Sequence, residues 1–228
     1  QSIRGDFLPK FIGWDDGEFP LLVLEDLSAA TWSWKWSQEY IQRVLTTLDK
    51  VANTHVPQSF PELSQMSAQL TGWQEVAKNP SGFLGLSLVS PAWLARALPT
   101  LVQAEKGIKL GGSSLVHFDV RSDNMCFYGD RTLLIDWNWA RKGNPKVDLI
   151  SWLPSLHSEG GPPPWEITMD EPELIAAVAG FYASRAPQSI DKQGEELRQL
   201  RLRMLKSALP WAIRALDLPR LEEAQTKY

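Results

Sequence analysis

The sequence predicts a chain of the α+β class, in which a mostly helical body carries a small β insert. Apolar residues recur at helical spacing in several long segments, whereas the short apolar runs typical of strands are found at few places. The 228 residues are 43% hydrophobic and 22% charged, which is enough for one substantial core or two lobes.

The first half of the chain predicts one strand and two helices. Residues 19–27, FPLLVLEDL, are an apolar run with a polar end, which predicts a buried strand that leaves into a connector. Residues 37–52 place apolar side chains on one helical face, with Ser37 as the N-cap. Residues 90–104 open with a Ser-Pro pair, which is typical of a helix start.

The middle of the chain predicts a hairpin, a helix and a loop. Residues 124–136 are two short apolar runs on either side of a Gly-Asp turn, so we expect a small β-hairpin. Residues 147–156 predict a helix that stops near Pro154. Residues 160–166, GGPPPWE, predict an irregular loop.

Two further helices are expected in the last third. Asp170 and Glu173 have the spacing of a capping box before an apolar stripe, which predicts a helix over 170–185. Residues 195–216 repeat apolar side chains at helical spacing, with a kink expected at Pro210. The β insert therefore lies between helices.

Composition excludes several classes of protein. The formal net charge is −4 and no block of like charge occurs, so we expect no nucleic-acid partner. No run of about 18 apolar residues and no signal peptide are found, so we expect no membrane span and a cytoplasmic location. The single cysteine, Cys126, excludes an internal disulfide and a multi-cysteine zinc site. No pattern sets an oligomeric state.

The loop HFDVRSDN, residues 117–124, holds polar side chains between two apolar runs. The expected hairpin folds the chain back, so Asn124 and Asp136 would lie side by side. Both offer the hard oxygen ligands that Mg²⁺ takes when water and phosphate complete its shell. Asp119 could accept a proton from a hydroxyl group beside that metal, and Arg121 could neutralise a phosphoryl oxygen.

This layout resembles the aminoglycoside phosphotransferases and related small-molecule kinases, which share the protein-kinase fold. The matching segments are LVHFDVRSDNMCF and LLIDWNWARKGNPKVDLISW. The pattern H-x-D-x-x-x-x-N is complete, IDW stands where protein kinases have D-F-G, and Asp148 opens a matching D-L pair. The resemblance covers residues 113–153 and extends to residues 8–28.

The resemblance implies a domain division and a nucleotide. Residues 1–27 would be the remnant of the N-terminal nucleotide lobe with its hinge, and residues 28–228 the helical C-terminal lobe. In the hinge, the Glu25 carbonyl and the Leu27 amide would meet the adenine edge. The implied cofactors are ATP, with GTP as the alternative, and Mg²⁺.

The resemblance also implies roles for the loop residues. Asp119 would be the base, Arg121 would balance charge, and Asn124 with Asp136 would hold Mg²⁺. Asp148 would hydrogen-bond the amides of the loop and so orient Asp119.

The acceptor is expected to be a small molecule. Asp148 comes only twelve positions after Asp136, and no A-P-E sequence follows, so there is little room for a peptide-docking segment. Choline-type kinases read I-D-F-E-Y where this chain has I-D-W-N-W, which weighs mildly against them. An aminoglycoside, macrolide, amino alcohol, sugar or amino acid all stay open as hydroxylated substrates.

An aminated, cationic substrate has four candidate contacts after the metal aspartate: Glu159, Trp165, Asp170 and Glu173. The alternative for Asp170 and Glu173 is that they merely cap a helix.

The chain departs from the family pattern at its start. A phosphate-covering loop and a strand lysine with its glutamate partner are not found before Leu8. Three explanations of this departure stay open: the chain is a fragment, it is a natural truncation, or it is a degenerate kinase that binds nucleotide or ligand without catalysing a reaction. The intact Asp119, Asn124 and Asp136 argue against degeneracy, so a kinase is the first hypothesis and a binding module the alternative.

Overall fold

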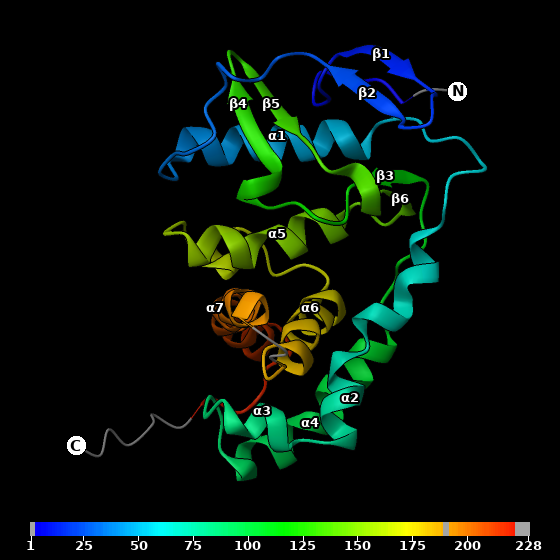
Figure 1. Cartoon of the computed structure of the whole chain (residues 1–228). Coiled ribbons are helices and arrows are strands. Elements are labelled where there is room, and N and C mark those ends of the chain that lie inside the picture. Colours follow the sequence, from blue (N-terminus) through cyan, green and yellow to red (C-terminus); the bar gives the residue numbers. More distant parts are fainter. Residues whose placement is uncertain (1–2, 189–191, 222–228) are drawn as a thin grey trace. The chain divides into compact units, whose positions relative to one another are not determined.

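The computed structural model describes residues 3–188 and 192–221 (Figure 1). It is a mixed structure with 51% helix and 12% strand, which agrees with the α+β prediction. The chain divides into two compact units, residues 1–63 with 111–152 and residues 64–110 with 153–228. The predicted lobe boundary between residues 27 and 28 stays a prediction. No helix of the described residues has the length and apolar character needed to cross a membrane.

The first unit contains the strands that the structure describes, paired in antiparallel twos. The pairs are β1 (Phe11–Asp15) with β2 (Leu21–Leu24), β3 (Ser114–Val116) with β6 (Arg141–Gly143), and β4 (Met125–Tyr128) with β5 (Arg131–Leu134). Helix α1 (Gln38–Ala52) belongs to the same unit, with short 3₁₀ turns η2 (Ser122–Asn124) and η3 (Trp137–Trp139).

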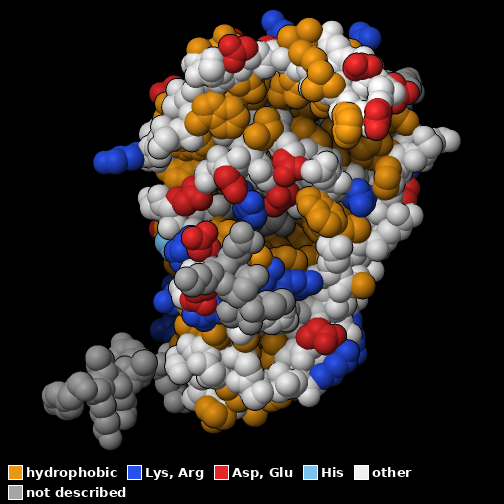
Figure 2. Space-filling view, viewed as in Figure 1, with side chains coloured by type: hydrophobic (Ala, Val, Ile, Leu, Met, Phe, Trp, Pro, Cys, Tyr) orange, Lys and Arg blue, Asp and Glu red, His pale blue; other side chains and the backbone are white. Residues whose placement is uncertain are grey.

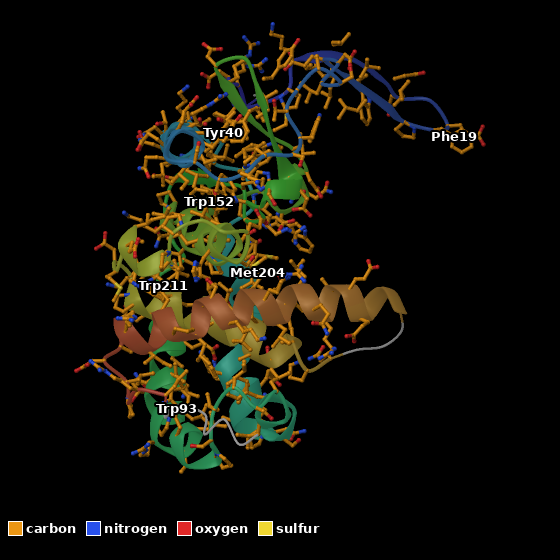
Figure 3. All side chains as sticks on the ribbon, turned by 90° about the vertical axis from the view of Figure 1, so that its left-hand side faces the viewer. Phe19, Tyr40, Trp93, Trp152, Met204 and Trp211 are labelled. Carbon is orange, nitrogen blue, oxygen red and sulfur yellow. The ribbon has the colours of Figure 1, made fainter. Side chains whose placement is uncertain are left out.

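The strand predicted within residues 19–27 forms as β2, but the prediction that it is buried is wrong. The side chains of Leu21 and Leu24 are 57% and 39% exposed, and Phe19 at the turn is 82% exposed. Figure 3 shows Phe19 at the far tip of the β1–β2 ribbon, and Figure 2 shows apolar side chains on the surface. The reason is that a two-stranded ribbon covers neither of its own faces.

Helix α1 and the β4–β5 hairpin form as predicted. The Ser37 side chain accepts a hydrogen bond from the Tyr40 amide at 3.3 Å, and Val44 and Val51 are buried. The hairpin turns at Gly129, whose φ of +59° lies in the left-handed region that favours glycine. Cys126 on β4 is buried.

The second unit is built from helices and 3₁₀ turns. They are η1 (Leu63–Leu70), α2 (Gly72–Lys78), α3 (Ser81–Gly85), α4 (Pro91–Lys106), η4 (Pro164–Glu166), α6 (Pro172–Arg185) and α7 (Lys192–Ala215). Helix α4 begins as predicted, since the Ser90 side chain accepts from the Trp93 amide at 3.1 Å. Met204 and Trp211 of α7, labelled in Figure 3, are buried in this unit.

Two predicted helix ends are wrong. Helix α5 (Lys146–Ser158) does not stop at Pro154 but runs four residues further. Leu153 and Leu156 are fully buried, so packing on both sides of the proline outweighs its lost hydrogen bond. Helix α6 has no capping box, because its N-cap is Glu171 in a left-handed conformation and its first helical residue is Pro172.

Helices α2 and α6 approach each other through two glycines. A Cβ atom added at Gly72 would lie 1.8 Å from the carbonyl oxygen of Gly180. The Glu105 carboxylate of α4 accepts from the Trp73 amide at 2.8 Å and from the Gln74 amide at 2.9 Å, so it caps α2 from outside. Burial raises the pKa of Glu105, against the hydrogen bonds from Trp73 and Gln74, which lower it.

We expect Gly72→Ala to destabilise the protein by about 2–3 kcal/mol, because overpacking against fixed backbone exceeds the gain in helix propensity. Differential scanning fluorimetry should show the midpoint falling by roughly 5–10 °C. Gly85→Ala is the matched control, because a Cβ there would meet nothing within 4 Å. Equal midpoints for both variants would mean that the close approach of α2 and α6 is not needed.

Candidate active site

The polar loop of residues 117–124 connects β3 to β4. It begins with buried His117, passes through Phe118 at φ +68°, and ends in the 3₁₀ turn η2. A phenylalanine in the left-handed region costs about 1–3 kcal/mol, so neighbouring contacts must hold it there.

Asp148 supplies those contacts from the start of α5. Its side chain accepts hydrogen bonds from the His117 and Phe118 amides, both at 2.7 Å, and the residue is only 3% exposed. Burial raises the pKa of Asp148 to about 7, although the two amide hydrogen bonds lower it. These are the amide contacts that the family resemblance implies for Asp148, while its role in activity stays a prediction.

His117 braces the backbone on both sides of its ring. Its Nε2 lies 2.8 Å from the Ile135 carbonyl and must donate, and its Nδ1 accepts from the Asp119 amide at 3.3 Å. These partners require the neutral imidazole with its proton on Nε2. Burial lowers the pKa of His117, which favours the same neutral form, while the carboxylates of Asp119 and Asp136 raise it.

Asn124 ties the end of the loop to Asp119. Its Nδ2 donates to the Asp119 carbonyl and to Asp119 Oδ2, both at 2.9 Å. Asn124 is 7% exposed, whereas the Asp119 side chain is 27% exposed. The carboxylate of Asp119 is therefore fixed in place and open to a ligand.

Arg121 lies beside the same carboxylate. Its Nη1 is 3.7 Å from Asp119 Oδ1, while its Nε and Nη2 donate to the two oxygens of Asp123 at 3.0 and 2.8 Å. Asp123, which lies in the η2 turn, thus holds the guanidinium in a bidentate pair at the surface. Arg121 is thus held next to Asp119 by its pair with Asp123.

Asp136 follows β5 and is exposed, with φ +60° and ψ +61°. The hairpin register pairs Met125 with Leu134, and the Ile135 amide donates to the Asn124 carbonyl at 2.9 Å. The backbones of Asn124 and Asp136 are therefore neighbours at the open end of the hairpin. Asn138 Nδ2 donates to Asp136 Oδ1 at 2.5 Å and orients it.

These donors suit Mg²⁺ that is shared with a phosphate. No group of three or more Asp, Glu, His or Cys side chains in the described part of the chain could hold a metal alone. One amide and one carboxylate at the end of a hairpin leave most of the coordination shell to phosphate oxygens and water, as is usual for this ion.

The predicted hinge follows β2. The Glu25 amide donates to the Lys10 carbonyl at 2.9 Å, and the Leu27 carbonyl accepts from the Trp32 indole at 2.9 Å. The two groups predicted to contact adenine are the Glu25 carbonyl and the Leu27 amide. Neither group takes part in these two hydrogen bonds. Their contact with adenine stays a prediction.

The four candidate substrate residues belong to the second unit. Glu159 accepts from Ser155 Oγ at 3.1 Å, and the Asp170 amide donates to Thr168 Oγ1 at 3.0 Å. Glu173 is exposed in the first turn of α6.

The Trp165 ring already has a cation on it. The Arg214 guanidinium lies 4.4 Å from the ring centroid, and the His157 ring is 6.2 Å away. A cationic substrate would have to contact the part of the Trp165 ring that Arg214 does not cover. Substrate contact by Trp165 therefore stays a prediction.

Sequence reasoning missed Trp137. This residue follows Asp136, and its ring packs on His117 with centroids 4.4 Å apart and on Phe7 at 5.6 Å. Its indole donates to the Leu134 carbonyl at 2.9 Å. An aromatic residue directly after Asp136, the predicted metal ligand, was the available signal, since it stands at the position of the phenylalanine of D-F-G.

Asp119, Asn124 and Asp136 come from one loop and the adjoining hairpin, which is the arrangement that the phosphotransferase resemblance predicts. The phosphotransferase enzyme family model matches residues 36–186, more than half of the chain, and the chain belongs to that family. No curated protein sequence matches the chain.

Two solved structures are similar in fold. A choline/ethanolamine kinase family protein from Mesorhizobium loti is 14% identical with a TM-score of 0.50, and the match covers 92% of this chain and 77% of that chain. An ADP-bound aminoglycoside phosphotransferase is 15% identical with a TM-score of 0.41, and the match covers 87% of this chain and 76% of that one. The first likeness supports a kinase-like fold.

Proposed function

We propose that the protein transfers the γ-phosphoryl group of ATP, in the presence of Mg²⁺, to a hydroxyl group of a small molecule. Among the acceptors that the sequence leaves open, an aminoglycoside-like or other aminated alcohol is the first to test. The observation that carries the proposal is the hydrogen bond from Asn124 to Asp119 beside the exposed Asp136, within a chain of the phosphotransferase family.

In the proposed reaction, Asp119 orients the acceptor hydroxyl and takes its proton. The acceptor oxygen forms a bond to the γ-phosphorus, and the bond from that phosphorus to the bridging oxygen of ADP breaks. Arg121, 3.7 Å from Asp119, balances the charge of the phosphoryl oxygens.

Asn124 and Asp136 would hold Mg²⁺ on the nucleotide phosphates. When bound, the ion neutralises phosphate charge and favours departure of ADP. Asp148 and His117 hold the loop so that Asp119 keeps its orientation. The Glu25 carbonyl and the Leu27 amide would receive the adenine edge, with GTP as the alternative nucleotide.

The experiment follows nucleotide consumption by the complete encoded protein. ATP and GTP, each with Mg²⁺, are offered with a panel of aminoglycosides, macrolides, amino alcohols, sugars and amino acids. Asp136→Ala is expected to abolish turnover on the acceptor that responds, because it removes the only carboxylate of the proposed metal pair. Asp130→Ala, an exposed carboxylate in the turn of the same hairpin, is the control.

Turnover with one acceptor, lost in Asp136→Ala and kept in Asp130→Ala, supports the proposal and names the substrate class. Nucleotide binding without turnover on any acceptor would favour the alternative of a binding module. A folded protein that binds no nucleotide would overturn the proposal.

A further inference from the structure

Arg131 is the first residue of β5, and its side chain reaches back to the start of the chain. Its Nη1 donates to both carboxylate oxygens of Glu25, at 2.8 and 3.2 Å. Its Nη2 donates to the Leu8 carbonyl at 2.7 Å, and its Nε donates to the Asp6 carbonyl at 3.0 Å. All three guanidinium nitrogens thus hold residues on either side of the β1–β2 ribbon.

This arrangement is shielded from water. The side chains of Arg131 and Glu25 are 19% and 13% exposed, unlike the ribbon itself. A second attachment lies further along β5, where the Leu134 amide donates to the Phe7 carbonyl at 2.9 Å and the Phe7 ring is buried. The residues on either side of the β1–β2 ribbon are therefore attached to β5. Figure 1 shows the ribbon and the β4–β5 hairpin in the same part of the molecule.

Arg43 of α1 holds the hairpin turn from another direction. Its Nη2 donates to the carbonyls of Gly129 and Arg131, both at 2.9 Å. Its guanidinium also lies 4.7 Å from the Phe127 ring centroid. The backbone of Arg131 is thus fixed by α1 while its side chain holds Glu25.

We infer that Arg131 is a positioning residue that sets the spacing between the proposed adenine site at Glu25–Leu27 and the proposed metal site at Asn124–Asp136. The inference rests on the proposed function. Strand β5 runs from Arg131 toward Asp136, and the hinge leaves Glu25 toward Leu27. One ATP molecule must occupy the adenine site and the metal site at once. The distance between the two sites therefore decides how strongly ATP can bind to both.

The physical reason is that a ligand with two linked parts gains affinity only when both sites are correctly spaced. Lysine cannot replace arginine here, because one ammonium group cannot make the planar, three-directional set of contacts. Arg131→Lys keeps the charge but releases part of the ribbon. It should weaken a ligand that spans both sites more than a ligand that fills one.

The test compares the dissociation constants of adenosine and Mg-ATP for the complete protein, wild type and Arg131→Lys. We expect the variant to bind Mg-ATP about tenfold more weakly or worse, with a change of less than about threefold for adenosine. Lys142→Met is the matched control: it breaks the partly buried Lys142–Glu62 pair, 2.8 Å long, in the same unit. The control should change neither constant.

Equal losses for adenosine and Mg-ATP, or no loss for either, would overturn the inference. Hydrogen exchange at the Leu134 amide adds a readout that needs no nucleotide: it should be faster in Arg131→Lys than in wild type or Lys142→Met. Unchanged exchange would overturn the structural half. The wild type could bind no nucleotide while the Leu134 amide still exchanges faster in Arg131→Lys than in the wild type. That result would reject the proposed function and, with it, the nucleotide half of the inference.

Discussion

Asp119→Asn is expected to lower turnover by about 10²–10⁴-fold while Mg-ATP affinity changes by less than about threefold. The substitution removes the proton acceptor but keeps a carbonyl oxygen that can accept from Asn124, so the loop geometry is retained. Steady-state kinetics with the acceptor found in the panel, together with nucleotide titration, measure the two quantities separately.

Asp130→Asn is the matched control, because it makes the same chemical change on an exposed carboxylate of the adjoining hairpin. Its turnover should be that of the wild type. Near-normal turnover of Asp119→Asn, with nucleotide still bound, would show that the base has been assigned to the wrong residue.

Asp148→Asn should lower turnover by about 100-fold although the residue is buried, because the loop that carries Asp119 shifts. An asparagine offers one acceptor oxygen to two amides, so the His117 or Phe118 amide loses its partner. A buried amide without a partner costs about 1–3 kcal/mol. The strained backbone of Phe118, at φ +68°, would then relax and move Asp119.

The same variant should change how stability depends on pH. Burial raises the pKa of Asp148 from 3.8 to about 7, so between these values the folded state binds the proton that the unfolded state has released. The free energy of unfolding contributed by this group therefore falls as pH rises from about 4 to 7, by about 4 kcal/mol in total. Asp148→Asn should lack this fall.

Urea denaturation at several pH values between 4 and 8 measures that difference. His117 acts in the opposite direction, because its pKa is lowered in the folded state: as pH falls below 6.5 the unfolded state takes up a proton that the folded state does not, so the free energy of unfolding falls. Subtracting the variant from the wild type removes the part of the histidine contribution that the two proteins share. Asp123→Asn, an exposed carboxylate of the same loop, is the control, and identical pH slopes for wild type and Asp148→Asn would contradict the prediction.

Local geometry explains which parts of the site were predictable. Asn124 reaches Asp119 across only five residues, and a glycine turn closes the hairpin that carries Asp136. Such short distances along the chain leave few alternative arrangements. The spacing of residue types was therefore sufficient to predict the loop and the hairpin, and the family was predicted from the resemblance of these segments to known phosphotransferases.

Helix ends were less predictable, because a capping residue or a proline in the sequence does not show how the residues around it are buried. Ser37 and Ser90 cap their helices as expected. Pro154, however, lies inside α5 between fully buried leucines, and α6 begins at Pro172 rather than at an Asp170 cap. A proline signal shows only that a hydrogen bond is lost, and not whether packing replaces it.

The amino-acid sequence by itself determined the class of the protein and the residues around which its chemistry is proposed. Only the tertiary structure decided that β2 is exposed, that Asp148 holds the amides of His117 and Phe118, and that Arg131 reaches Glu25 across 106 residues. The physical reason is that exposure and long-range pairing depend on which surfaces meet after folding. The spacing of residues along the chain does not show which surfaces come into contact.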